Sequence, residues 1–137
     1  MAEYAGFKEL LVDVIENDSV VLSAGLPAEA VYRADTVYET VDHDEFIVLR
    51  FGEASAQMGG TMVVPWEILG YCSTGNTDRM KRICYAARMA VERIEHTLTD
   101  SGHFTTAEFV GIGPDQWDAG FNAIVLSTRM RCVASGY

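Results

Sequence analysis

The chain has 137 residues, of which 49% are hydrophobic and 22% are charged, and its formal net charge is −10. This length and composition predict one globular domain with a single core and exclude a disordered chain. The acidic balance argues against a protein that clamps nucleic acid, because phosphate binding needs clustered basic side chains. No apolar run is long enough to span a membrane, and the first residues lack the pattern of a signal peptide. We therefore expect no membrane partner and assembly in a cytoplasm.

The first part of the chain predicts one helix followed by less regular structure. Residues 5–16 place apolar side chains at helical spacing, which indicates a short amphipathic helix. Gly25 and Pro27 then indicate a turn, and residues 30–35 are compatible with a short strand. The segment 35–45 is strongly acidic, so we expect an exposed loop or strand edge there.

Two strands joined by a glycine-flanked connection are predicted next. Residues 46–51 are rich in β-branched and aromatic side chains, and residues 61–71 form a second such run. Together they predict a hairpin with a long loop. Pro65 lacks an N–H group for the ladder, so we expect the second strand to lie at an edge or to carry a bulge.

The longest predicted element is an amphipathic helix over residues 76–98, which contains no glycine or proline. Its start is expected to be capped by Asn76 or Thr77, whose oxygens can accept from free N–H groups. The side chains expected to face the core are Met80, Ile83, Cys84, Ala87, Val91, Ile94 and Leu98.

A second stripe runs along the opposite face of this helix and consists of Arg82, Tyr85, Met89, Arg93 and His96. One interpretation is that the tyrosine and methionine simply lie flat on the surface. The other is that the stripe contacts a partner, because aromatic residues, methionine and arginine are enriched at interfaces.

The last part of the chain predicts two strands, over residues 104–112 and 121–133, with a loop between them. In the final strand Ile124, Leu126, Met130 and Cys132 alternate with polar side chains, which is typical of a sheet with one buried and one wet face. The predicted fold is a single α+β domain over residues 1–137. It has an antiparallel sheet of about four to five strands, with the long helix and the short N-terminal helix packed on it.

Patterns that carry catalysis or metal binding are weak. The run 42–45 (Asp-His-Asp-Glu) can be drawn as a metal site, but neighbours in an extended chain point to alternating sides, so a solvated loop is favoured. Glu53, Glu67 and Glu108 are conceivable acid–base groups, yet nothing in the sequence places them together. We therefore expect no catalytic residues, no metal and no cofactor.

Two further features have plain structural readings. Residues 73–76 precede the long helix but lack the glycine pattern and lysine of a phosphate loop, which favours helix capping. The three cysteines, Cys72, Cys84 and Cys132, show no paired spacing and are interpreted as small core residues.

Four short motifs carry a family resemblance. They are Val-Leu-Arg at 48–50, Val-Val-Pro-Trp at 63–66, Asp-Arg-Met-Lys-Arg-Ile at 78–83 and Asp-Ala-Gly-Phe at 118–121. In this order the segment 46–133 resembles the tail terminator proteins of long-tailed (siphovirus) bacteriophages, in particular those that infect actinobacteria. The first 45 residues carry little of the likeness.

The resemblance implies a structural role in a virion. Proteins of the family that this segment resembles are small α+β subunits, and they form a hexameric ring on the head-proximal end of the tail tube. The ring stops tube polymerisation, binds the tube protein and the head-closure (stopper) protein, and lets DNA pass through its lumen without specific binding. The residues expected to contact subunits or partners are Arg82, Tyr85, Met89, Arg93, Gln57, Met58 and Trp117. Those expected to form an acidic lumen are Asp42, Asp44 and Glu45.

Two other classes of function remain open at this point. One is a different neck connector, such as a head-closure or adaptor protein, or a tail tube component. Closure proteins tend towards β-barrels and adaptors towards helical bundles, so a sheet interrupted by one long helix favours the terminator. The other class is a small cytoplasmic enzyme or ligand-binding domain.

Overall fold

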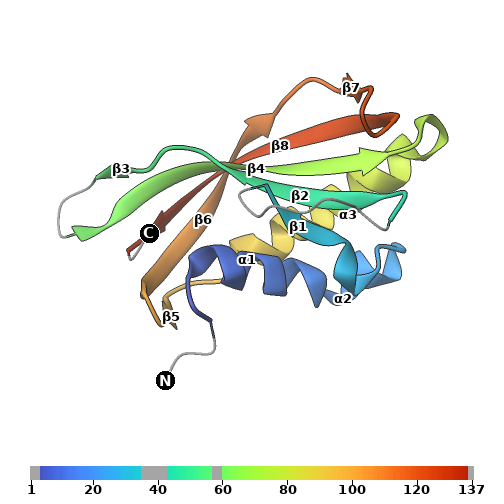
Figure 1. Ribbon diagram of the computed structural model, residues 1–137. Coiled ribbons are helices and arrows are strands. Elements are labelled where there is room, and N and C mark those ends of the chain that lie inside the picture. The colour runs from blue at the N-terminus through green and yellow to red at the C-terminus, as the bar shows by residue number, and fades with distance from the viewer. Residues whose placement is uncertain (1–3, 35–42, 57–59, 136–137) are drawn as a thin grey trace.

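The computed structural model describes residues 4–34, 43–56 and 60–135. Three helices, α1 (Phe7–Glu16), α2 (Ser19–Ser23) and α3 (Thr77–Glu92), lie against the same face of one twisted sheet (Figure 1). The strands are β1 (Val31–Arg33), β2 (Phe46–Phe51), β3 (Ser55–Ala56), β4 (Met62–Cys72), β5 (Thr97–Thr99), β6 (Gly102–Ile112), β7 (Gln116–Asp118) and β8 (Ala123–Ala134). The predicted α+β class, with helices on one side of a sheet, is confirmed. No helix in this part of the chain has the length and apolar character needed to cross a membrane.

The sheet has eight strands rather than the four to five predicted, in the order β1-β2-β4-β8-β6-β5, with β3 paired to β4 and β7 to β8. The strands missing from the count are short, since β3 has two residues and β5 and β7 have three each. Such short runs carry too little periodicity to be distinguished from loops. The sheet is also not wholly antiparallel, because β1 pairs with β2 in parallel.

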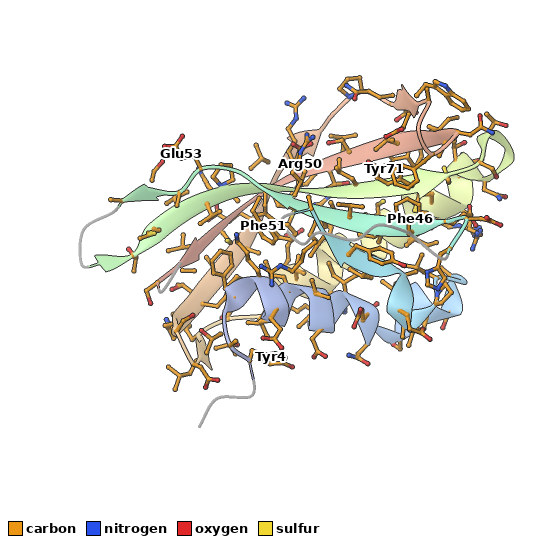
Figure 2. The ribbon with its side chains drawn as sticks, in the orientation of Figure 1. Tyr4, Phe46, Arg50, Phe51, Glu53 and Tyr71 are labelled. Atoms are coloured by element: carbon orange, nitrogen blue, oxygen red, sulfur yellow. The ribbon has the colours of Figure 1, made fainter. Side chains whose placement is uncertain are left out.

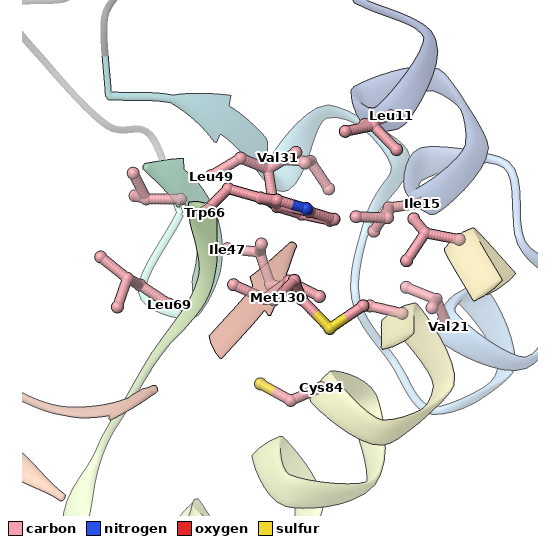
Figure 3. Packing of buried hydrophobic residues seen from close by; sticks show 14 of the residues in the cluster. Leu11, Ile15, Val21, Val31, Ile47, Leu49, Trp66, Leu69, Cys84 and Met130 are labelled. Atoms are coloured by element: carbon pink, nitrogen blue, oxygen red, sulfur yellow. The ribbon is translucent and has the colours of Figure 1, made fainter. Parts of the chain in front are cut away.

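The core lies between β4 and β8, at the centre of the sheet, and the helices. Alternate side chains of each strand face the helices, as the predicted alternation in β8 requires, and Met130 and Cys132 are buried. Figure 3 shows Trp66 of β4 packed towards Leu11 and Ile15 of α1. The buried face of the sheet therefore packs against the helices through aliphatic and aromatic contacts.

Pro65 lies in an interior strand, so of the two predicted alternatives the edge position is wrong. The other, a bulge, fits the register, because residues 52–54 lie opposite residues 64–65, three against two. β4 pairs with β8 along its whole length, and its other side pairs first with β3 and then with β2. Pro65 lies opposite Gly52, between those two partners, where the Gly52 N–H donates to the Pro65 carbonyl at 2.7 Å. Pro65 thus lies where the pairing of β4 passes from β2 to β3, and the absence of its N–H costs no ladder hydrogen bond there.

The long helix is shorter than predicted, because α3 ends at Glu92 rather than near residue 98. His96 has a left-handed backbone (φ 49°), and residues 97–99 then form β5, which pairs with β6. Pairing with a distant strand therefore outweighs the helical spacing of this segment. As a result Leu98, predicted to face the core, is 66% exposed.

The start of α3 also differs from the prediction in its capping. Asn76 is the N-cap residue but forms no capping hydrogen bond, and its amide instead donates to Ser73 Oγ at 3.0 Å. Thr74–Asn76 form a short 3₁₀ turn ahead of the helix. Asp78 lies in the first turn, where its charge complements the positive end of the helix dipole.

Candidate functional site

Four residues of the second stripe, Arg82, Tyr85, Met89 and Arg93, line one surface, whereas His96 lies beyond the end of α3 and contacts His103. With Val20 of α2, these side chains border a shallow groove of about 520 Å³. The lining residues are Val20, Lys81, Arg82, Tyr85, Ala86, Met89 and Arg93. Tyr85 is 58% exposed and Val20 55% exposed, so the groove presents apolar area to the outside. The structure thus brings four predicted interface residues together, and we call this surface the α3 groove.

Charges around the α3 groove fall into paired and unpaired groups. Arg93 donates to Asp18 at 3.1 Å, and Asp18 also caps α2 by accepting from the backbone of that helix. Arg88 lies over the ring of Phe109 and pairs with Glu92 at 2.7 Å. Lys81 and Arg82, by contrast, form no hydrogen bond or ion pair within the described residues. Two cations beside an apolar floor suit a partner surface that is both apolar and acidic.

Trp117 is the fifth of the predicted interface residues that the structure describes, and it lies on the other side of the sheet. It is 55% exposed on β7 and borders a second groove, of about 540 Å³, over the sheet face that no helix covers. Arg50, Glu67, Tyr71 and Arg129 form part of the same lining. Figure 2 shows Arg50 on this open face and Phe51, the next residue, on the face towards α1. The predicted interface residues therefore belong to two separate surfaces.

A charge network lies at the centre of the open face. Glu67 accepts from Arg50 through Oε1 at 2.7 Å and from Ser127 through Oε2, also at 2.7 Å. Burial opposes ionisation of this carboxyl, but the two hydrogen bonds and the charges of Arg50 and Arg129 outweigh it and lower the pKa of Glu67. The carboxylate is therefore held ionised, with both oxygens in use.

An aromatic cluster closes one end of the open face. The ring of Phe46 stacks on Tyr71, with centroids 4.5 Å apart, and Phe121 contacts both rings edge-on. Burial, followed by the nearby charge of Asp118, raises the pKa of the Tyr71 phenol. The phenol is consequently neutral near pH 7 and serves as a hydrogen-bonding group with an apolar body.

The predicted acidic lumen residues have different surroundings. Asp44 is exposed, whereas Glu45 is largely buried and forms an ion pair with Arg79 at the start of α3. Arg79 also donates to the Ala24 carbonyl at 3.1 Å, which ties α3 to the end of α2. Asp42 lies outside the described residues, as do Gln57 and Met58 from the predicted interface.

Two of the three conceivable acid–base groups, Glu67 and Glu108, have structural partners, and the third, Glu53, is exposed. Glu67 belongs to the network above, and Glu108 forms an ion pair with Arg131. His43 shares a hydrogen bond with Tyr32 at 2.9 Å. Within the described ranges, no three His, Cys, Asp or Glu side chains are placed to hold a metal ion.

The sulfur atoms are placed in the core, as predicted for all three cysteines. Cys72, Cys84 and Cys132 are free and buried. Burial raises the pKa of Cys84 and of Cys132 to about 12, so these thiols stay protonated and unreactive at neutral pH.

These features define a small α+β domain with one sheet, helices on a single face and two separate exposed grooves. No known family model matches the chain, and no curated protein matches it in sequence. Among solved structures, the fold is similar to that of a chain in the "virion of native gene transfer agent (GTA) particle". The two chains superpose with a TM-score of 0.65 over 98% of this chain and 100% of the other, at 15% sequence identity. This likeness establishes a shared fold.

The open-face network was not predicted as a site. The sequence placed Ser127, Arg129 and Arg131 on one wet face, but it gave no sign that Glu67 lies beside them. The hydrogen bond from Ser127 to Glu67 joins residues 60 positions apart in the chain. Only the pairing of β4 with β8, in which Glu67 faces Arg129, reveals the arrangement.

Proposed function

We propose that the protein is a structural subunit of a phage-like virion and, specifically, a tail terminator that forms a ring on the head-proximal end of a tail tube. The observation that supports this most is the fold shared with a gene transfer agent virion chain over the full length of that chain. The four motifs between residues 48 and 121 point to the terminator among virion proteins. In this role the ring stops tube growth and joins the tail to the head-closure protein.

The α3 groove suits assembly into a closed ring. A ring built from one repeated head-to-tail contact needs two different patches on each subunit. The α3 groove, on the helix side of the sheet, is proposed as one of these two patches. We infer that Arg82, Tyr85 and Met89 contact a neighbouring subunit, with Arg93 positioned beside them by Asp18.

The acidic charge suits a channel through which DNA passes. A net charge of −10 repels phosphates, so a duplex can slide without being held. Among the predicted lumen residues that the structure describes, Asp44 is exposed, so we propose that it faces the channel. Glu45 forms an ion pair with Arg79, so we assign it a structural role rather than a place in the lumen.

The terminator role is tested on particles from a producing lysate. Gold-labelled antibody is expected to mark a single position, at the head–tail junction, and deletion of the gene is expected to give overgrown tubes. Label along the whole tail would instead identify a tube subunit. Junction label with tubes of normal length would favour a head-closure or adaptor protein, and particles without label would refute a virion role.

The ring contact is tested separately with charge substitutions. Met89→Glu and Tyr85→Glu are expected to reduce ring formation, seen by native mass spectrometry in the presence of tubes, while the fold is retained. Leu98→Glu is the control, because Leu98 is an exposed apolar residue (66%, against 58% for Tyr85) that lies on β5, away from the α3 groove. Rings formed normally by both α3 variants would remove this surface from the interface.

A further inference from the structure

Arg129 is a cation at the centre of the open face. It lies on β8 directly across from Glu67 on β4, and its charge acts on that carboxyl through space. Within the described residues, however, Arg129 forms no hydrogen bond or ion pair. Its guanidinium lies beside Gly113, where an added Cβ would be 3.4 Å from Nη2. All of its donors therefore remain available.

The other arginines on this face have ion-pair partners. Both oxygens of Glu67 are occupied, by Arg50 and by Ser127. Arg131, two residues along β8, pairs with Glu108 of β6. Asp118 also borders the groove, and its Oδ1 accepts from the Phe121 N–H, so among the described residues Arg129 is the arginine of this face that lacks an ion pair.

The space around Arg129 is an elongated trough rather than a closed pocket. The groove of 540 Å³ below β7 and a neighbouring hollow of 620 Å³ both border on Arg50, Glu67 and Arg129. We call the two together the open-face trough. Towards one end it is bordered by Tyr71 and Trp117, and towards the other by Pro65 and Val110.

We propose that the open-face trough binds an extended segment of a partner protein, in which one carboxylate side chain is flanked by apolar residues. The carboxylate takes the free donors of Arg129 in the planar, two-bonded geometry that guanidinium groups favour. The flanking apolar side chains cover Trp117 at one end and Val110 at the other, which are 55% and 57% exposed.

Charge complementarity favours an acidic peptide over a nucleic acid. A peptide brings a single carboxylate to the guanidinium of Arg129, which has no ion pair among the described residues. A nucleic acid brings a row of phosphates, and beside Arg129 these would meet the ionised Glu67 and the carboxylate of Asp118, which borders the same groove. This inference concerns the open face and does not depend on which part of a virion the subunit occupies.

The test uses the full chain and two synthetic pentapeptides with blocked ends, Ser-Leu-Glu-Leu-Ser and Ser-Leu-Gln-Leu-Ser. Titrations are followed by NMR, with detection of the arginine side-chain Nε–H signals. We expect the Glu peptide to bind at least about tenfold more tightly than the Gln peptide, since a charged hydrogen bond is worth about one decade in affinity. The Nε–H signal of Arg129 is expected to shift with the Glu peptide.

Variants separate Arg129 from a general effect of charge. Arg129→Gln is expected to abolish the preference for Glu, and Arg129→Lys to retain it in part, because the charge stays but the planar fork is lost. Arg82→Gln is the matched control, because it removes an unpaired arginine from the α3 groove and is expected to leave the preference unchanged. Thermal melting of each variant confirms that it is folded.

Three results would overturn the proposal. One is equal binding of the two peptides to the unaltered chain, and another is equal preference for Glu in the Arg129→Gln variant. The third is tighter binding of a thymidine decanucleotide than of the Glu peptide, which would make the trough a nucleic-acid surface. Gold labelling at the head–tail junction is unaffected by any of these results, so the terminator proposal stands or falls separately.

Discussion

The two faces of the sheet are built from the same strands but are stabilised in different ways. On the covered face, α3 approaches β4 so closely that a Cβ on Gly70 would lie 2.6 Å from the Sγ of Cys84. On the open face, charged side chains satisfy one another in pairs, as Arg50 does with Glu67. Close packing resists any added atom, whereas exposed ion pairs contribute little each and can be exchanged.

This difference separates stability from recognition. The covered face fixes the position of α3 and of every strand, and we expect substitutions there to change the free energy of unfolding. The open face and the outer side of α3 contribute less to folding, so their side chains are available for contacts with other molecules. Four predictions test this division.

Gly70→Val is expected to have the largest effect. The added side chain must displace Cys84 and Met80, both buried, and overpacking of this kind costs about 3 kcal/mol of unfolding free energy. Urea denaturation measures the change. Gly111→Ala is the control, because a Cβ there has no neighbour within 4 Å, and a cost below about 0.5 kcal/mol is expected. Equal costs at the two glycines would show that the α3–β4 contact is not tightly packed.

Arg79→Met comes next, with an expected loss of about 2 kcal/mol. It leaves the Glu45 carboxylate, whose side chain is 16% exposed, without its cation, and it removes the hydrogen bond to Ala24. Urea denaturation again provides the measurement, and Glu45→Gln in the same chain is expected to recover part of the loss.

Arg82→Met, one turn further along α3, serves as the control for Arg79→Met. Arg82 has no ion pair within the described residues, so its loss is expected to change stability by less than about 0.5 kcal/mol. A similar loss in both variants would mean that general charge, not the pair with Glu45, stabilises α3.

Glu67→Gln is expected to cost about 1 kcal/mol near pH 7. The pKa of Glu67 is lower in the folded chain than its ordinary value of 4.5, so the carboxylate contributes stability above about that pH. The contribution is lost as pH falls through the folded pKa. Denaturation curves between pH 7 and pH 3 should therefore converge for the two proteins at the acidic end. A difference that stays constant with pH would contradict an electrostatic origin.

The cysteines provide the smallest expected effect, which is none. All three thiols face the core, and the raised pKa of Cys84 and Cys132 keeps them protonated. A thiol reagent at pH 8 should leave the folded chain unlabelled and label three positions in urea. Val110→Cys, on the open face, is the positive control and should react at once. Labelling of a native thiol in the folded chain would show that the covered face opens.

Periodicity predicted the parts of this fold that one buried face determines. The alternation in residues 121–133 gave β8 its correct faces, and helical spacing grouped Tyr85 with Met89 on one surface. Both patterns record which side of an element meets the core, so a single sequence contains them. The same reasoning predicted that all three cysteines are buried.

Contacts between distant segments were not predictable in this way. The helical pattern runs on past Glu92, but the pairing of Thr97 with Phe104 turns the chain into β5. No local pattern places Glu67 beside Ser127. Nor does any local pattern show that Arg129, opposite Glu67, has no ion pair among the described residues. These features follow from strand order and register, which depend on the whole sheet.

The place of β8 in the sheet also has a consequence for synthesis. It is the last described strand along the chain, yet it lies at the centre and pairs with β4, β6 and β7. While β8 is still inside the ribosome, the nascent chain has two incomplete sheet halves with unpaired edges at β4 and β6. Both the covered core and the open-face trough are therefore completed in the same step, when β8 joins the sheet. A chain that ends before β8 lacks Arg129, and with it the cation of the open-face trough.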